Sequence, residues 1–181
     1  MAGMNRRSVL GALAVAPFGA VYGQSGSDVD VPYVNTPQNV VDAMLDLAGV
    51  GASDRLIDLG SGDGRIVITA AQKFGATAVG VEYDKALVTQ SRQRLLSLNL
   101  GKLASIIEGD IFEQNYADAD LITVYLLPIT NIRLSPVLEK TIKKGVRIVC
   151  HDFEFTEWNP EKTEVMEDTE GRSHTLFFYR R

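Results

Sequence analysis

Residues 55–65, which read R-L-I-D-L-G-S-G-D-G-R, constrain the fold of this chain more than any other stretch. The apolar run from Leu56 to Leu59 is typical of a strand that is buried on both faces. Alternating glycines follow it, and glycine lets a backbone turn sharply and approach a ligand closely. The next segment, Arg65 to Lys73, carries small or apolar side chains at helical spacing. The stretch therefore predicts a strand, a glycine turn and a helix N-terminus, with a nucleotide-like cofactor at the turn.

Strand-like and helix-like segments alternate along the remainder of the chain. Helices are predicted over residues 38–47, 65–73 and 85–98, and another is predicted to start with Ser135 as its cap and Pro136 in its first turn. Buried strands are predicted over residues 56–59, 76–83, 104–108, 121–126 and 146–150. Residues 161–170, with Asp168 among their exposed acids, and residues 173–179 form a hairpin. This order predicts an α/β fold, a doubly wound, mostly parallel seven-stranded sheet with a C-terminal antiparallel hairpin.

Acidic residues stand where two of the predicted strands end. Glu82, followed by Tyr83, closes the second strand, where a carboxylate can accept hydrogen bonds from both ribose hydroxyls of an adenosine cofactor. Asp110 follows the third strand, where it can accept from an adenine amino group while Ile111 packs on the ring. Together with the glycine turn, these positions predict an adenosine-containing cofactor.

The charges around the glycine turn separate two cofactor classes, dinucleotides and S-adenosylmethionine. A dinucleotide motif would need glycine at position 65, where this chain has arginine. Asp58 and Asp63 place carboxylates around the turn, which suits a cationic amino group and sulfonium and would repel a pyrophosphate. The pattern therefore favours a methyltransferase over an oxidoreductase.

Composition narrows the classes of partner and site. The formal net charge of −5 and a pI near 5.0 argue against nucleic-acid binding, which depends on Lys and Arg neutralising phosphates. Cys150 is the one cysteine, and the strand around it indicates a small core residue. With His151 and His174 as the only histidines, the sequence argues against a zinc site, and no metal is predicted.

The first 23 residues differ from the rest of the chain. Arg6 and Arg7 precede an apolar stretch from Val9 to Tyr22, in an order that resembles a twin-arginine export signal. At roughly 14 residues this stretch is short of the ~20 that cross a bilayer. We therefore divide the chain into a signal or membrane anchor (1–23), a linker (24–31) and a catalytic domain (32–181). The expected location is export or membrane attachment through the N-terminus, and otherwise the cytoplasm.

Two tyrosines are candidates for contact with the substrate. Two prolines keep residues 31–37 extended. This segment can therefore lay Tyr33 and Thr36 across the mouth of the cofactor site. Tyr33 could equally be an aromatic side chain packed against the sheet. Tyr125 begins the loop Y-L-L-P after the fourth strand, and ligands of open parallel sheets bind at such carboxyl ends. Tyr125 and Tyr33 are thus the predicted catalytic pair, which would orient the nucleophile.

Several of these motifs together resemble one family. They are P-Y-V-N-T-P (32–37), D-L-G-S-G-D-G-R-I (58–66), G-V-E-Y (80–83), G-D-I-F (109–112), Y-L-L-P (125–128) and F-x-F-x-x-W-x-P (153–160). The combination resembles the small class I S-adenosylmethionine-dependent methyltransferases, and within them the lysine methyltransferases of the ATP synthase c-subunit and the adenine nucleotide translocase, with their bacterial relatives. The resemblance implies that Asp58, Gly60 and Gly62 line the methionine part of the cofactor. It departs at the N-terminus, where a twin-arginine-like segment takes the place of the family's hydrophobic segment.

The resemblance implies methyl transfer from S-adenosyl-L-methionine to a lysine of a protein substrate by in-line displacement. The predicted cofactor-binding set is Asp58, Gly60, Ser61, Gly62, Asp63, Gly64, Glu82, Tyr83, Asp110 and Ile111. The loop after the fourth strand lacks the D/N-P-P-Y sequence of methyltransferases that act on amide or base nitrogens, which disfavours nucleic acid. Two alternatives stay open: a methyltransferase of small metabolites, and an exported or membrane-attached binding protein that keeps the fold without catalysis.

Overall fold

The computed structural model describes residues 33–181, so the expectations for residues 1–23 and 24–31 lie outside the described part of the chain. Its elements in chain order are α1 (Gln38–Ala48), β1 (Arg55–Leu59), α2 (Arg65–Phe74), β2 (Thr77–Glu82), α3 (Lys85–Ser97), β3 (Ala104–Glu108), β4 (Leu121–Val124), α4 (Pro128–Thr141), β5 (Arg147–His151), β6 (Lys162–Glu167) and β7 (Ser173–Arg180).

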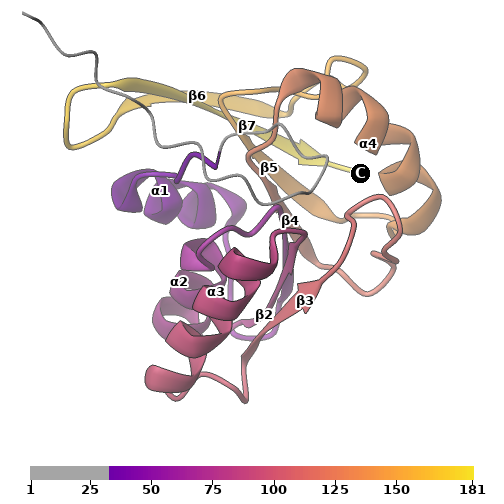
Figure 1. The fold of residues 1–181 in the computed structure, drawn as a ribbon. Coiled ribbons are helices and arrows are strands. Elements are labelled where there is room, and N and C mark those ends of the chain that lie inside the picture. Colours follow the sequence, from indigo (N-terminus) through magenta and orange to yellow (C-terminus); the bar gives the residue numbers. More distant parts are fainter. Residues whose placement is uncertain (1–32) are drawn as a thin grey trace, which may run out of the picture. The chain divides into compact units, whose positions relative to one another are not determined.

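All seven strands belong to one sheet in the order β3-β2-β1-β4-β5-β7-β6. Strands β1 to β5 run parallel, whereas β7 is antiparallel to β5 and β6 is antiparallel to β7 (Figure 1). The order reverses at β1, which pairs with β2 on one side and β4 on the other, and this is the point where open α/β sheets bind ligands. The predicted α/β fold with a C-terminal antiparallel hairpin is confirmed.

Helices cover the two faces of the sheet unequally. Neighbouring strand residues point to opposite faces, so Leu56 packs with α1, α2 and α3 while Ile57 packs with α4. Figure 1 shows α2 and α3 side by side on one face and α4 on the other. Around α4, aromatic side chains take the place of further helices: Tyr116, Phe155, Trp158 and Tyr179.

The fourth helix begins earlier than the sequence predicted. It starts at Pro128 and runs through Ser135 and Pro136, so these two residues do not form its cap and first turn. Pro136 has no N–H to donate to the carbonyl of Ile132, one turn earlier. The Ser135 hydroxyl donates to that carbonyl instead, at 3.2 Å, which compensates for the missing bond.

The C-terminal hairpin also differs from expectation at one residue. The side chains of β6 are mostly exposed, as an edge strand predicts. Asp168, in the turn that follows, is buried, and it accepts hydrogen bonds from the backbone N–H groups of Glu170 and Arg172. Its role is therefore to hold the turn, and it does not belong to the exposed acidic face. None of the helices in residues 33–181 combines the length and apolar character that crossing a membrane requires.

Candidate functional site

The glycine turn after β1 adopts a conformation that few other residues could share. Gly60, Gly62 and Gly64 have φ angles of 73°, 53° and 78°, in the left-handed region. A Cβ on Gly62 would collide with the ring of Tyr33, which lies over the turn. The N–H groups of Gly60 and Ser61 donate to the Val81 carbonyl at 2.9 and 3.0 Å, which fixes the turn against β2.

Glu82 fastens this turn to the start of the third helix. Its Oε2 accepts from the Gly62 N–H at 2.7 Å, and its Oε1 accepts from the Asp84 N–H at 2.8 Å. Asp84 in turn caps α3. Each carboxylate oxygen has a second lone pair, so Glu82 retains acceptor capacity at the end of β2.

Asp58 is a buried carboxyl at the switch point of the sheet. It is 3% exposed and accepts a hydrogen bond from the Thr123 hydroxyl at 2.7 Å. Burial raises its pKa to about 7, an effect that the Thr123 hydrogen bond opposes and that the negative charges of Glu82 and Asp63 increase. Among residues 33–181 no basic side chain forms an ion pair with it, so Asp58 can take a cationic ligand group.

Asp63 and Ser61, also predicted to bind cofactor, have different surroundings. The Asp63 carboxylate forms ion pairs with Arg65 at 2.9 Å and Arg94 at 2.6 Å, so its charge is compensated within the protein. These contacts link the start of α2 to the last turn of α3, and they give no support to the idea that Asp63 faces a cationic cofactor. Ser61 Oγ is buried without a hydrogen-bond partner in the described part of the chain, so it could pair with a ligand.

The predicted adenine contacts follow β2 and β3, which are neighbours in the sheet. Asp110 Oδ1 accepts from the Phe112 N–H at 2.8 Å in the turn after β3, and Ile111 is half-buried beside it. Tyr83 is exposed at the end of β2. Glu82 pairs with Glu108 in the register of the two strands, so Tyr83 and Asp110 leave the sheet at the same edge.

The two candidate tyrosines lie at different parts of this edge. The Tyr33 hydroxyl accepts from the Asp63 N–H at 3.4 Å, on the glycine turn. The Tyr125 ring lies 3.9 Å from that of His151 and 6.2 Å from that of Phe153, measured between centroids. Burial raises the pKa of both phenols, with Asp63 acting in the same direction on Tyr33 and Asp152 on Tyr125. Both hydroxyls therefore stay protonated near neutral pH.

A polar cluster that the sequence analysis did not anticipate surrounds His151. His151 ends β5, and the antiparallel pairing of β5 with β7 brings His174 of β7 to within 2.8 Å of it. Asp152 joins the two rings, while Thr36 and Asp168 contact their outer sides. Burial lowers the pKa of His151 to about 4, so this ring is neutral at pH 7. The signal that could have revealed the cluster, two histidines and acids at adjacent strand ends, needs the β5–β7 pairing.

Asn131 is a second residue that the sequence analysis passed over. It lies in the first turns of α4, and its side-chain Nδ2 donates to the Phe153 carbonyl at 3.0 Å. Its Oδ1 is buried without a partner in the described chain. Asn131 thus ties the first turns of α4, which follow the Tyr125 loop, to the loop after β5, which carries Asp152.

A comparison with protein families identifies the family to which this chain belongs. The family model described as ANTKMT methyltransferase domain matches residues 58–162, from the end of β1 to the start of β6. This chain belongs to that methyltransferase family. The matched span contains the glycine turn and the predicted adenosine contacts at Glu82 and Asp110.

Individual relatives of this methyltransferase agree on the family and differ in named substrate. A protein-lysine N-methyltransferase of Saccharolobus islandicus is 41% identical over 150 residues, 82% of this chain and 92% of that protein. The human lysine N-methyltransferase of the ATP synthase c-subunit is 34% identical over 106 residues, 59% of this chain and 45% of the human protein. A structure titled RNA methyltransferase from Salinibacter ruber, in complex with S-adenosyl-L-homocysteine, is 41% identical, covers 82% of this chain and 95% of that chain, and has a TM-score of 0.74.

Proposed function

We propose that this methyltransferase transfers the methyl group of S-adenosylmethionine to lysine side chains of proteins. The observation that carries the proposal is the 41% identity to a protein-lysine N-methyltransferase over 82% of this chain and 92% of that protein. The lysine N-methyltransferases of the ATP synthase c-subunit add support from a second branch, although this chain spans about half of their length. The loop after β4 reads Y-L-L-P and lacks the D/N-P-P-Y sequence associated with amide and base nitrogens.

The residues of the site fit S-adenosylmethionine. Asp58 is a buried carboxylate that lacks a cationic partner among residues 33–181, and the amino group of the cofactor would supply one. The ribose would hydrogen-bond to Glu82 and the adenine to Asp110, at neighbouring strand ends. When bound, the cofactor offers a methyl group on a sulfonium, which leaves as a neutral thioether after attack by an amine.

The side chains of this protein would act by positioning. Holding nucleophile and methyl donor in line and close accounts for most of the acceleration in such displacements. A lysine ammonium must lose a proton before it attacks, and burial favours this loss by lowering the lysine pKa. Tyr125 and Tyr33 carry protonated hydroxyls, so their role would be to orient the amine and not to take its proton.

RNA is the competing acceptor, because the Salinibacter structure is titled an RNA methyltransferase at the same 41% identity. The charge of this chain disfavours RNA: 23 acidic residues against 18 basic ones give a net charge of −5. Non-specific binding to a phosphate backbone depends on clustered Lys and Arg. An acidic protein more readily attracts a basic peptide segment that contains lysine.

A labelling experiment decides between acceptors. The full chain is incubated with methyl-labelled S-adenosylmethionine and, separately, with a protein extract, total RNA or a small-molecule fraction. We expect label in protein, recovered as methyllysine after acid hydrolysis, and none in RNA. Label confined to RNA or to small molecules would reject the lysine proposal, and no label in any fraction would favour a binding protein without catalysis. Asp58→Asn serves as the control for background transfer.

We also propose that residues 1–23 bring the protein to a membrane, either for export or for attachment. The support is compositional: two arginines precede an apolar stretch that extends to Tyr22. Fractionation of cells that express the full chain or a chain starting at Gln24 tests this. The full chain should appear with membranes or in the exported fraction, and the shortened chain should stay in the cytosol. Identical distributions would reject the proposal.

A further inference from the structure

Three side-chain atoms from the hairpin end of the sheet converge on one point. His151 Nε2 lies 2.8 Å from His174 Nδ1, Asp152 Oδ2 lies 3.1 Å from His174 Nδ1, and Asp152 Oδ2 lies 3.2 Å from His151 Nε2. Both histidines are buried, and Asp152 is the most exposed of the three, with a side chain 25% exposed. The three atoms thus form a small triangle in which each atom is within contact distance of the other two.

Protons alone cannot satisfy this triangle. A hydrogen bond needs a donor on one side and a lone pair on the other, and each of the three atoms offers one or the other. If one atom carries a proton, it can donate to the other two atoms, but those two atoms then face each other with lone pairs. If two atoms carry protons, one edge joins two donors. A cation at the centre accepts a lone pair from all three atoms and leaves no edge unpaired.

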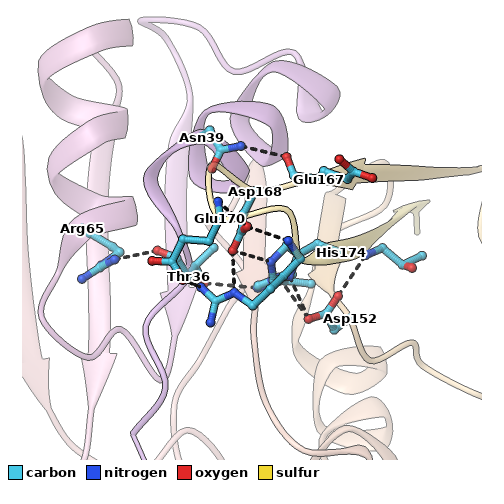
Figure 2. A network of polar contacts seen from close by, with 11 residues as sticks. Thr36, Asn39, Arg65, Asp152, Glu167, Asp168, Glu170 and His174 are labelled. Carbon is cyan, nitrogen blue, oxygen red and sulfur yellow. Dashed lines mark hydrogen bonds and ion pairs between the residues drawn. The ribbon is translucent and has the colours of Figure 1, made fainter.

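The surroundings of the triangle orient these lone pairs inward. The outer nitrogen of His151 contacts Thr36 Oγ1 at 3.2 Å, and the outer nitrogen of His174 contacts Asp168 Oδ2 at 3.3 Å. Figure 2 shows His174 between Asp168 and Asp152. Metal-binding histidines almost always engage their second nitrogen in this way, with a carboxylate or another polar group.

The two carboxylates are themselves held in place. Asp152 Oδ1 accepts from the Thr175 N–H at 2.9 Å, which turns Oδ2 toward the histidines. Asp168 pairs with the Arg172 guanidinium at 2.8 Å in addition to its backbone bonds. Asp152 has a φ of 58°, a strained value for a residue with a side chain, and this backbone conformation places its carboxylate at the cluster.

We infer that His151, His174 and Asp152 form a binding site for a divalent transition metal, with zinc as the probe. Bonds of about 2.1 Å at right or tetrahedral angles separate ligand atoms by roughly 3.0 to 3.4 Å, close to the 2.8 to 3.2 Å seen here. Two imidazoles and one carboxylate suit zinc and other divalent first-row transition metals, and they leave at least one coordination position open. The inference stands on these side chains and does not depend on the proposed methyl transfer.

The position of the site indicates what a bound metal would do. The metal would tie the end of β5 to β7, and through Thr36 it would reach the segment that lies over the glycine turn. The His151 ring also packs on Tyr125. The metal would therefore hold the Tyr125 loop and the Tyr33 segment in fixed positions, acting on the substrate side of the fold without touching the reacting atoms.

Metal titration of the full chain tests the inference without any activity assay. The untagged protein, stripped with a chelator, is titrated with Zn²⁺ by calorimetry and with Co²⁺ by visible absorption. We expect one equivalent bound, a Co²⁺ spectrum with histidine coordination, and a rise in Tm. Asp152→Asn and His174→Gln should weaken binding by more than about 100-fold, whereas Thr36→Val, which removes an outer contact only, should weaken it roughly 10- to 100-fold.

Controls separate this site from surface binding. Glu164→Gln changes a half-exposed acid of β6 that pairs with Lys162, away from the cluster, and should leave Zn²⁺ affinity unchanged. If a histidine variant does not fold, Asp152→Asn and Thr36→Val still provide the comparison. The inference is overturned if the wild-type chain binds no Zn²⁺, or if Asp152→Asn and Thr36→Val bind it as well as the wild type does.

Discussion

Replacing Asp58 by asparagine should make the folded protein more stable at high pH and reduce the dependence of its stability on pH. Asp58 has a pKa of about 7 in the folded protein because it is buried, against about 3.9 for an aspartate in an unfolded chain. Between these values the folded protein keeps a proton that the unfolded chain releases. The free energy of unfolding therefore falls as the pH rises from about 4 to about 7. Asparagine keeps an acceptor for the Thr123 hydroxyl and has no charge to bury.

The size of this effect follows from the two pKa values. The two pKa values differ by about 3, and each pKa unit corresponds to about 1.4 kcal/mol. The loss in free energy of unfolding that Asp58 causes above pH 7 is therefore at most about 4 kcal/mol. Part of that loss has already occurred at pH 5.5, so between pH 5.5 and 8.5 the wild-type protein should lose about 2 kcal/mol relative to Asp58→Asn. Other titrating groups are common to both proteins and cancel in the comparison.

Urea denaturation of both proteins at several pH values measures the difference directly. Asp118→Asn, at an exposed carboxylate with a side chain 62% exposed, provides the matched control and should parallel the wild type. Saturating S-adenosylmethionine should remove most of the pH dependence from the wild type, because its amino group would pair with the ionised Asp58. Parallel stability curves for the wild type and Asp58→Asn without ligand would refute the argument that Asp58 is a buried carboxyl without a cation.

Three further changes test the site. Gly62→Ala should lower stability by more than Gly49→Ala, because both glycines have a left-handed φ but only Gly62 faces the ring of Tyr33. Thermal melts should show this excess loss of stability, of order 1 kcal/mol or more. Adding Tyr33→Ala to Gly62→Ala should remove the excess. Glu82→Ala should weaken S-adenosylmethionine binding in calorimetry by about 1 to 3 kcal/mol, and unchanged affinity would make Glu82 a purely structural contact. Tyr125→Phe should lower kcat for methyl transfer while leaving cofactor affinity unchanged, and an unaltered kcat would exclude its hydroxyl from orienting the nucleophile.

Local sequence patterns predicted much of this fold because a strand, a glycine turn and a helix each depend on nearby residues. The run from Arg55 to Phe74 formed as expected, since its apolar spacing and its glycines leave few alternatives. The start of α4 was not predictable in this way. Pro136 normally marks a helix N-terminus, but here it lies inside the helix, where the hydroxyl of Ser135 bonds the carbonyl that Pro136 leaves free.

The polar cluster shows a second limit, which concerns contacts between distant residues. His151 and His174 are 23 residues apart, and Thr36 is 115 residues from His151. The small number of histidines argued against a zinc site. Composition, however, says nothing about which strand ends lie together in the fold. The register between β5 and β7 decides that, and these two strands, which β6 separates in the chain, carry no motif that sets it.

The double attachment of Glu82 sets a limit on the ligands that the site can accept. A carboxylate offers about four lone-pair positions, and the backbone N–H groups of Gly62 and Asp84 occupy two of them. Two positions remain, which equals the number of free hydroxyl donors, 2′ and 3′, on the ribose of an adenosyl group. A ribose with a phosphate on its 2′ oxygen would bring a negative charge where a donor is needed, and a deoxyribose would leave one position unused. If Glu82 binds the ribose as proposed, the two positions left by these hydrogen bonds would favour an unmodified ribose over phosphorylated and deoxygenated sugars.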